Sequence, residues 1–201
     1  MEKHEGAEAE GLREEQGKAL LWLARETIAR KLGMEAHEPE PEIAARLQDA
    51  ELQQKRGVFV TLKAHGELRG CIGCLVATDA MVEEVKRNAL HAAFGDSRFR
   101  PVEKEELGAI EVEISILTAP TPLAYTSPEE LLRALRVGID GVIILQGGLS
   151  ATFLPQVWQQ LPDPQDFLSH LCRKACLPAD AWRSGGLEVF TYRVQYFEEH
   201  G

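Results

Sequence analysis

The chain has 201 residues, 44% of them hydrophobic, which is enough for one large domain or two small interlocked ones to bury a core. Its formal net charge of −10, without a basic stripe, argues against a protein that binds nucleic-acid backbones nonspecifically. Four cysteines without a secretion signal predict reduced thiols, and no apolar run approaches the roughly 20 residues of a membrane helix, so we expect a cytoplasmic protein without a membrane span.

The first part of the chain predicts one long helix after a polar start. Residues 1–13 are rich in glycine, alanine and glutamate, so we expect this acidic N-terminus to be disordered. From Glu14 to Leu32 apolar residues recur at helical spacing, and Gly33 follows as a stop. The prolines of "HEPEPE" predict a connector, followed by a short helix around Ile43–Leu47.

The next stretch predicts a hairpin, a helix and a strand. In "GVFVTLKAHGELRGCIGCLV" two β-rich runs flank a turn at Ala64–Glu67. "TDAMVEEVKRNALHAAF" predicts a helix capped by Thr78 or Asp79 and ended by "DSRFRP". "AIEVEISIL" alternates strictly, which is typical of a half-buried strand.

The second half predicts two capped helices and two strands. Ser127, Pro128 and Glu130 form a capping-box pattern, and Asp163 begins another helix by a similar cap. "DGVIILQGG" is nearly continuous in apolar residues and predicts a central strand, and "LEVFTYRVQYF" predicts a final strand.

These elements predict the fold class and the domain organisation. Strands and helices are interspersed without a regular βαβ repeat, and the hairpin requires antiparallel pairing. We therefore expect an α+β fold with a largely antiparallel or mixed sheet and flanking helices. Residues 14–197 are expected to form a single domain, with 198–201 as a tail.

The strand "ELRGCIGC", residues 67–74, has an unusual composition. Strand alternation places Arg69, Cys71 and Gly73 on one face and Leu68, Gly70 and Ile72 on the other. A guanidinium beside a thiol favours the reactive thiolate, and the glycines would let a ligand or another backbone approach closely. The alternative is structural, because glycine in a strand also marks a bulge or tight packing, and a buried cysteine is commonly a small hydrophobe.

These residues also carry a resemblance to a known family. "GVFVTLKAHGELRGCIG" resembles the hallmark of the AMMECR-one family, whose bacterial and archaeal members are called AmmeMemoRadiSam system protein A. The similarity continues through "NALHAAFGDSRFRPVEKEEL", "IEVEISILTAP", "GIDGVIIL", "LPQVW" and "FLSHLCRKACL", and covers about residues 15–197. It implies an α+β fold of two interlocked subdomains and no particular reaction. It also implies a pathway shared with a Memo-type protein and a radical S-adenosylmethionine protein.

The resemblance marks individual positions of this chain. The matching motif residues are Arg69, Gly70, Cys71, Ile72, Gly73, Asn88, Asp96, Arg98, Phe99, Pro101, Glu113, Ser115, Pro155 and Gln156. Cys74 and Cys176 depart from the family pattern, which usually has glycine at the second position. The pairs Cys71–Cys74 and Cys172–Cys176 could in principle bind zinc, but a shared metal site would not use cysteines peculiar to this chain. We therefore predict neither a metal nor a cofactor.

The polar motif residues outside the hairpin allow two interpretations each. Glu113 and Ser115 share one strand face and could orient a substrate or serve as a base, or they could belong to an ordinary solvated face. Gln156 begins a helix whose free N–H groups could bind an anion, or it is simply a helix start.

Asp96, Arg98 and Asn88 are interpreted mainly as scaffold. An Asp-x-Arg turn is typically a structural ion pair or cap, with ligand contact as the alternative. Asn88 is expected to be a buried amide that could fix the loop near Arg69.

Two functional hypotheses remain. The first is an enzyme or enzyme subunit that acts on a small molecule or a protein side chain, with Cys71 as nucleophile, Arg69 as activator or anion clamp, and Glu113 as acid or base. Its ligand-binding residues would be Gly70, Ile72, Gly73, Asn88, Ser115 and Gln156. The second is a noncatalytic adaptor for the Memo-type or radical S-adenosylmethionine partner, which predicts an exposed apolar patch and an unreactive thiol. The oligomeric state is not predicted.

Overall fold

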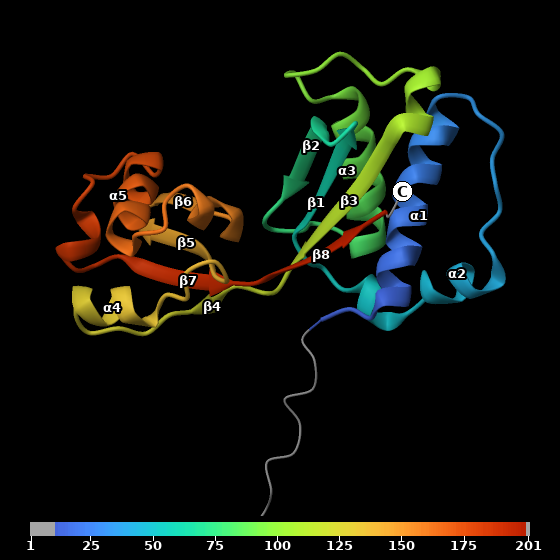
Figure 1. Cartoon of the computed structure of the whole chain (residues 1–201). Coiled ribbons are helices and arrows are strands. Elements are labelled where there is room, and N and C mark those ends of the chain that lie inside the picture. The colour runs from blue at the N-terminus through green and yellow to red at the C-terminus, as the bar shows by residue number, and fades with distance from the viewer. Residues whose placement is uncertain (1–10, 200–201) are drawn as a thin grey trace, which may run out of the picture. The chain divides into compact units, whose positions relative to one another are not determined.

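A computed structural model describes residues 11–199, which form helices and two four-stranded sheets (Figure 1). The fold is α+β, as predicted. The chain divides into two compact units. Unit 1 runs to Leu117 and resumes at Gln195, and unit 2 spans Thr118–Val194.

Unit 1 contains a sheet with the strand order β2-β1-β3-β8. Its elements are α1 (Glu14–Lys31), α2 (Pro41–Arg46), the 3₁₀ helix η1 (Ala50–Gln53), β1 (Val58–Ala64), β2 (Glu67–Cys74), α3 (Met81–Phe94), the 3₁₀ helix η2 (Lys104–Ala109), β3 (Ile110–Leu117) and β8 (Val194–Glu198). β1 pairs antiparallel with both β2 and β3.

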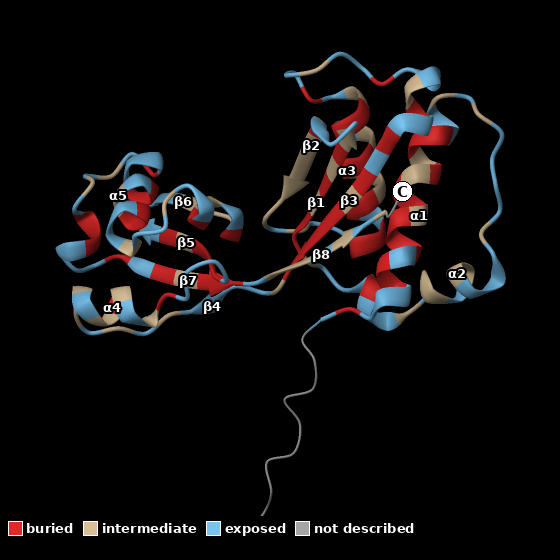
Figure 2. Cartoon of the chain, viewed as in Figure 1, coloured by how far each residue is buried: buried red, intermediate tan, exposed pale blue. Residues whose placement is uncertain are grey.

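The sheet of unit 1 has one face packed on helices and one polar face. The alternating residues that face the helices are buried, and they are Val58, Val60, Leu62, Val112, Ile114 and Ile116. They join the buried side chains of α1 and α3 in one core, which Figure 2 shows in red along these elements. Period-two alternation therefore leaves the residues between them on the opposite face.

The predicted turn of the hairpin is confirmed. His65 and Gly66 connect β1 to β2 with φ angles of 54° and 80°. Positive φ at both central residues is the signature of the tight turn whose twist matches that of paired strands. A glycine at the second position adopts this conformation without steric cost.

The predicted cap of α3 is wrong in detail. Ala80 is the N-cap residue, and it makes no side-chain cap hydrogen bond. The backbone N–H groups of Thr78 and Asp79 instead donate to Oε1 of Glu84, at 2.9 and 3.1 Å. The Glu84 carboxylate, which lies within the helix, thus accepts the N–H groups of the residues that precede it. A capping pattern in the sequence names only a side chain before the helix, so it does not predict this arrangement.

Unit 2 contains a sheet with the strand order β4-β7-β5-β6. Its elements are β4 (Thr121–Pro122), α4 (Pro128–Ala134), β5 (Gly141–Gln146), β6 (Leu149–Phe153), the 3₁₀ helix η3 (Pro155–Gln159), α5 (Pro164–Lys174), the 3₁₀ helix η4 (Ala181–Arg183) and β7 (Glu188–Tyr192). β5 lies between β7 and β6, so its predicted central position is confirmed. Both predicted caps also form, with Ser127 accepting from the N–H of Glu130 and Asp163 accepting from Gln165 and Asp166.

The predicted final strand is in fact two strands in two sheets. β7 belongs to the sheet of unit 2 and β8 to that of unit 1, with Arg193 between them. Thr118 N–H donates to the carbonyl of Arg193 at 2.9 Å, and Arg193 N–H donates to the Thr118 hydroxyl, also at 2.9 Å. These bonds pair the two stretches of chain that connect the units. The composition of "LEVFTYRVQYF" is uniformly β-rich and does not show the break.

The start of the described chain is held to unit 1. Leu12 is buried, and the side-chain amide of Gln195 both accepts from its N–H and donates to its carbonyl, each at 2.7 Å. Of residues 1–13, for which disorder is expected, 1–10 lie outside the described range, and the burial and hydrogen bonds of Leu12 run against the expectation for 11–13. Within residues 11–199, no helix has the length and apolar character needed to cross a bilayer.

Candidate functional site around Cys71

Three polar residues lie side by side on the polar face of the unit 1 sheet. The strand register pairs Thr61 with Cys71 on one side and with Glu113 on the other. We call Cys71, Thr61 and Glu113 the Cys71 row. Adjacent strands are about 4.8 Å apart, so the outer two residues of the row are separated by about 10 Å between backbones. A small molecule lying across β1 could contact both of them.

The backbone of Cys71 is bonded on the outer edge of the sheet. β2 is an edge strand, and its Cys71 N–H donates to Oδ2 of Asp96 at 2.9 Å. Nη2 of Arg98 donates to the Cys71 carbonyl at 3.3 Å. Because both backbone groups point away from β1, Thr61 and Cys71 form a non-hydrogen-bonded pair, in which side chains approach closely. Accordingly, the Thr61 hydroxyl donates to the Cys71 sulfur at 3.4 Å.

Asp96 and Arg98 form a tight ion pair beside this strand. Nε and Nη2 of Arg98 donate to the two carboxylate oxygens at 2.9 and 2.7 Å. The Asp96 side chain is only 4% exposed. The bonds from Arg98, and then the N–H of Cys71, hold the pKa of the Asp96 carboxyl far below its usual range. The Asp96 bond raises the pKa of Arg98, with a smaller contribution from Cys71, so both groups stay charged.

The Arg69 side chain bonds Glu106, whereas the sequence predicts that it lies beside Cys71. The register pairs Leu62 with Gly70 but Lys63 with Leu68, so Arg69 is the extra residue of a β-bulge. A bulge redirects side chains, and the guanidinium of Arg69 donates to the Glu106 carboxylate and to the Pro101 carbonyl.

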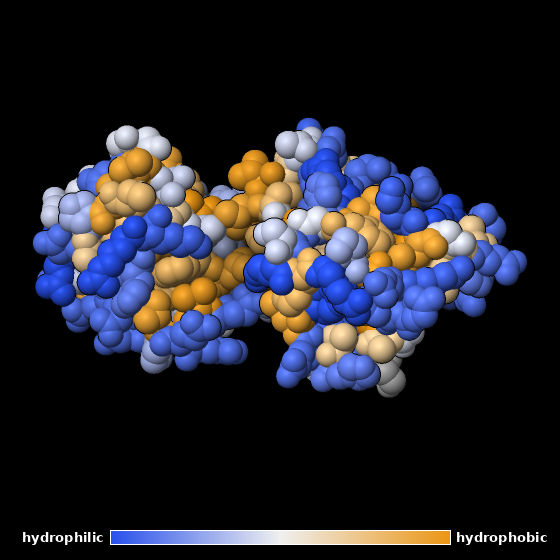
Figure 3. All heavy atoms as spheres, turned by 90° about the horizontal axis from the view of Figure 1, so that it is seen from above, coloured by the Kyte–Doolittle hydropathy of each residue, from blue (hydrophilic) through white to orange (hydrophobic). Residues whose placement is uncertain are grey.

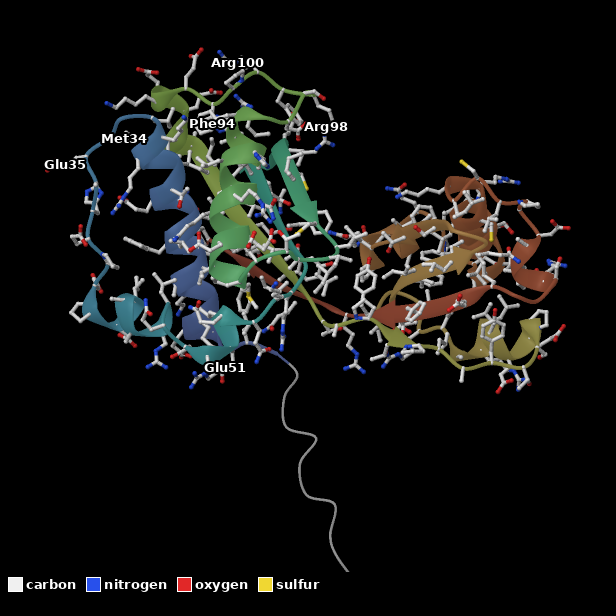
Figure 4. All side chains as sticks on the ribbon, turned by 180° about the vertical axis from the view of Figure 1, so that it is seen from behind. Met34, Glu35, Glu51, Phe94, Arg98 and Arg100 are labelled. Carbon is white, nitrogen blue, oxygen red and sulfur yellow. The ribbon has the colours of Figure 1, made fainter. Side chains whose placement is uncertain are left out.

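The bulge changes which cation lies next to the thiol. Regular strand alternation predicts Arg69 beside Cys71, whereas the bulge turns the Arg69 side chain toward Glu106. The cation bonded to Cys71 is Arg98, which the sequence suggested mainly as scaffold. Figure 4 shows Arg98 and Arg100 on the segment that follows α3.

Glu113 forms an ion pair with Lys63 on the same sheet face. Nζ of Lys63 lies 2.8 Å from Oε2 of Glu113. This hydrogen bond raises the pKa of Lys63, which is therefore a cation at neutral pH. Burial and then the Glu113 charge raise the pKa of Tyr196 on β8. The carboxylate at the end of the Cys71 row is thus accompanied by the ammonium group of Lys63 and the neutral phenol of Tyr196.

The glycines of the strand are explained by close packing. A Cβ on Gly70 would lie 2.2 Å from the carbonyl oxygen of Ala92 in α3, so the glycine admits a neighbouring backbone. A Cβ on Gly73 would lie 2.3 Å from the ring of Phe59, its cross-strand partner. Ile72 packs against the core on the helix side of β2.

Three other predicted ligand residues have separate surroundings. Asn88 is buried and donates to the carbonyl of Val58 at 3.1 Å, so it fixes α3 to β1 rather than the loop near Arg69. Ser115 is buried on β3 and pairs in register with Phe59. Gln156 is exposed at the start of η3 in unit 2.

The remaining cysteines differ from Cys71. Cys74 is three residues along the strand and faces α3, where Sγ donates to Glu84 at 3.2 Å and burial raises its pKa. Cys172 is buried in the core of unit 2, and Cys176 is exposed. Within the part of the chain that the structure describes, no three His, Cys, Asp or Glu side chains cluster in a way that could hold a metal ion.

Comparison with known proteins identifies the family. The family model AMMECR1 matches residues 21–197. The chain belongs to the AMMECR1 family. A protein of Methanothermobacter thermautotrophicus is 38% identical over 191 residues, covering 94% of this chain and 97% of that protein. A protein of Methanosarcina mazei is 40% identical over 189 residues, which is 94% of each chain.

A solved structure supports the fold. The crystal structure of the uncharacterized protein PH0010 from Pyrococcus horikoshii matches with a TM-score of 0.76 and 36% sequence identity. The match covers 94% of each chain. The AMMECR1 resemblance inferred from "LRGCIG", "DSRF" and "EISIL" is therefore confirmed, whereas these comparisons do not name a reaction.

Proposed function

We propose that this AMMECR1 protein is a cysteine-dependent enzyme or enzyme subunit that acts on a small molecule or a protein side chain. Cys71 is the nucleophile, and Glu113 is the acid or base on the same sheet face. Arg69 acts on the site indirectly, since its guanidinium bonds Glu106 and Pro101. We assign to Arg98 the role that the sequence suggested for Arg69, that of activator or anion clamp.

One observation carries the proposal: Cys71 is partly exposed on a polar sheet face while its backbone is fixed on both sides of the residue. The Thr61 hydroxyl donates a hydrogen bond to its sulfur at 3.4 Å, and the residue is partly exposed. Asp96 and Arg98 hold its N–H and carbonyl. A cysteine that only fills a core needs neither arrangement.

The proposed cellular context rests on the family resemblance. It places the protein in the cytoplasm, in a pathway shared with a Memo-type protein and a radical S-adenosylmethionine protein. Radical chemistry in that pathway would belong to the partner, because this chain has no cysteine triplet of the kind that binds a cluster.

The alternative is a noncatalytic adaptor for these partners. It is favoured by exposed apolar side chains at both ends of β2, with Leu68 44% and Val76 78% exposed. Figure 3 shows hydrophobic side chains interspersed among hydrophilic ones on the face in view. Single exposed apolar residues are common, so these two support the adaptor less strongly than the Cys71 row supports a reactive thiol.

The test is alkylation of the intact protein by iodoacetamide at pH 7, with each cysteine followed by mass spectrometry. We expect Cys71 to react faster than Cys176, although Cys176 is the more exposed of the two. Replacing Thr61 by valine keeps the shape but removes the donor, and we expect it to slow Cys71 severalfold while Cys176 is unchanged. If Cys71 is alkylated only after the protein unfolds, the enzyme proposal fails and the adaptor remains.

A further inference from the structure

We infer that the substrate of the Cys71 site carries an anionic group, most simply a carboxylate, which Arg98 binds beside the thiol. This inference rests on the proposed function of Cys71 and adds the class of molecule that the site accepts. Some N–H groups of the Arg98 guanidinium are bonded within the protein, and others remain to bind a ligand.

Two of the three nitrogens of Arg98 are used within the protein. Nε donates to Asp96, and Nη2 donates to Asp96 and to the Cys71 carbonyl. Nη1 makes no hydrogen bond with the described residues, and its two N–H groups are the donors left over. The Arg98 side chain is 55% exposed, so an incoming oxygen can reach it.

The bonds to Asp96 also fix the orientation of Arg98. Asp96 is almost fully buried, so one edge of the guanidinium is anchored in a planar, two-bond arrangement. A long arginine side chain normally loses rotamer entropy when it binds a ligand. Here that ordering has already occurred, as preorganised binding sites require.

Two arginines lie at this end of the row, Arg98 paired with Asp96 and Arg69 paired with Glu106, and the donors that these pairs leave over are what an anion could use. Glu113 lies two strands from Cys71 and is paired with Lys63, so its charge is largely neutralised. Along the outer edge of β2, Nη1 of Arg69 is a buried donor without a partner in the described structure. Arg98 is itself bonded to the main-chain carbonyl of Cys71, so an anion on Nη1 would be held beside this residue.

The chemistry requires an electrophilic carbon within a short reach of that anionic group. The thiol loses its proton to solvent, the sulfur lone pair forms a C–S bond, and the leaving group departs with the electron pair of its bond to carbon. Iodoacetate has this arrangement, with a carboxylate one carbon from an iodide leaving group. Iodoacetamide is its neutral counterpart and reacts by the same step.

The experiment compares the two reagents at Cys71 in the intact protein. The same thiolate attacks the carbon of both reagents, so the ratio of the iodoacetate rate to the iodoacetamide rate does not depend on the thiolate fraction. The reference is the same ratio at Cys71 in urea-unfolded protein. A favourable charge pair at about 4 Å near a surface is worth roughly 1 kcal/mol, so we expect the folded ratio to be about fivefold higher.

Three variants separate Arg98 from general effects. Arg98→Gln should return the ratio to the unfolded value, and Arg98→Lys should keep part of the increase because the charge remains. Arg100→Gln is the matched control: Arg100 is also exposed, lies two residues away and bonds Glu103 and Glu106. It should leave the ratio unchanged.

The outcomes distinguish this inference from the proposed function. Selective reaction of Cys71 with iodoacetamide, combined with a folded ratio equal to the unfolded one, overturns the anionic substrate and leaves the nucleophile intact. A raised ratio that persists in Arg98→Gln also overturns the role of Arg98. Failure of Cys71 to react with either reagent until the protein unfolds overturns both.

Discussion

The Asp96 carboxylate accepts the backbone N–H of Cys71 at 2.9 Å, although 25 residues separate them in the chain. The bond satisfies a donor on an edge strand, where the next strand of a sheet would otherwise do so. Asp96 accepts the Cys71 N–H and Arg98 donates to the Cys71 carbonyl. The two side chains thus make the hydrogen bonds that a residue of a neighbouring strand would make. The position of Cys71 therefore depends on a turn that lies beyond α3.

The first prediction concerns the stability that this turn provides. Asp96→Ala leaves the partly buried N–H of Cys71 and one edge of the Arg98 guanidinium without their acceptor, so we expect a loss of about 2–4 kcal/mol in the free energy of unfolding. Urea denaturation followed by circular dichroism measures this loss. Asp79→Ala is the control, because it removes an exposed carboxylate that also pairs with an arginine, Arg87. An equal loss in both variants would contradict the assigned role of Asp96.

The second prediction is the pH dependence of that contribution. The pKa of Asp96 is depressed in the folded state, so the unfolded state binds more protons as the pH falls below about 3.9. The stability due to Asp96 is therefore fully present above that pH and is lost as the pH falls toward the folded pKa. We expect the difference in unfolding free energy between wild type and Asp96→Asn to be constant from pH 7 to 5.

Below that range the two proteins should converge. Urea titrations at pH 5, 4, 3 and 2.5 would follow the decrease. A difference that stays constant down to the lowest pH would show that the lost hydrogen-bond geometry, and not the carboxylate charge, accounts for the effect of the substitution.

Local signals predicted much of the fold, and long-range contacts limited the prediction of the site. The turn at His65–Gly66 and the caps at Ser127 and Asp163 were predictable because each depends on residues within four positions. The break at Arg193 was not, because it depends on Thr118, 75 residues away.

The site shows the same limit. Sequence reasoning proposes Cys71 and Glu113 as site residues, and the register places them on one face of the sheet. Regular strand alternation assigns Arg69 to the thiol, and although the glycines allow a bulge, they do not say which residue is the extra one. The partnership of Arg98 with Cys71 requires knowing where the chain runs after α3.

The third prediction tests why the strand has two glycines. Gly70→Ala would place a methyl group against the backbone carbonyl of Ala92, which cannot move without shifting α3. Gly73→Ala would meet the Phe59 ring and also the Val58 carbonyl, and the ring is able to turn. We expect both to destabilise the protein by about 1–3 kcal/mol or more, with Gly70→Ala the larger effect.

A double-mutant cycle separates the two glycines. Phe59→Ala should relieve part of the cost of Gly73→Ala and none of the cost of Gly70→Ala, as measured by urea denaturation. Gly108→Ala is the control, because a Cβ there has open space around it. If Gly70→Ala were as mild as Gly108→Ala, the close approach of α3 to β2 would be incorrect.

The fourth prediction uses a cysteine in a glycine conformation. Cys176 follows the C-cap of α5 with φ of 60°, and its N–H donates to the Arg173 carbonyl while that of Leu177 donates to Cys172. This is the helix-ending motif that favours glycine, because a Cβ is strained at positive φ. We expect Cys176→Gly to stabilise the protein by about 1 kcal/mol, seen as a higher thermal midpoint. Cys176→Ala removes the thiol but keeps the Cβ, so it should leave the midpoint unchanged; an equal rise in both variants would trace the effect to the thiol instead of the backbone.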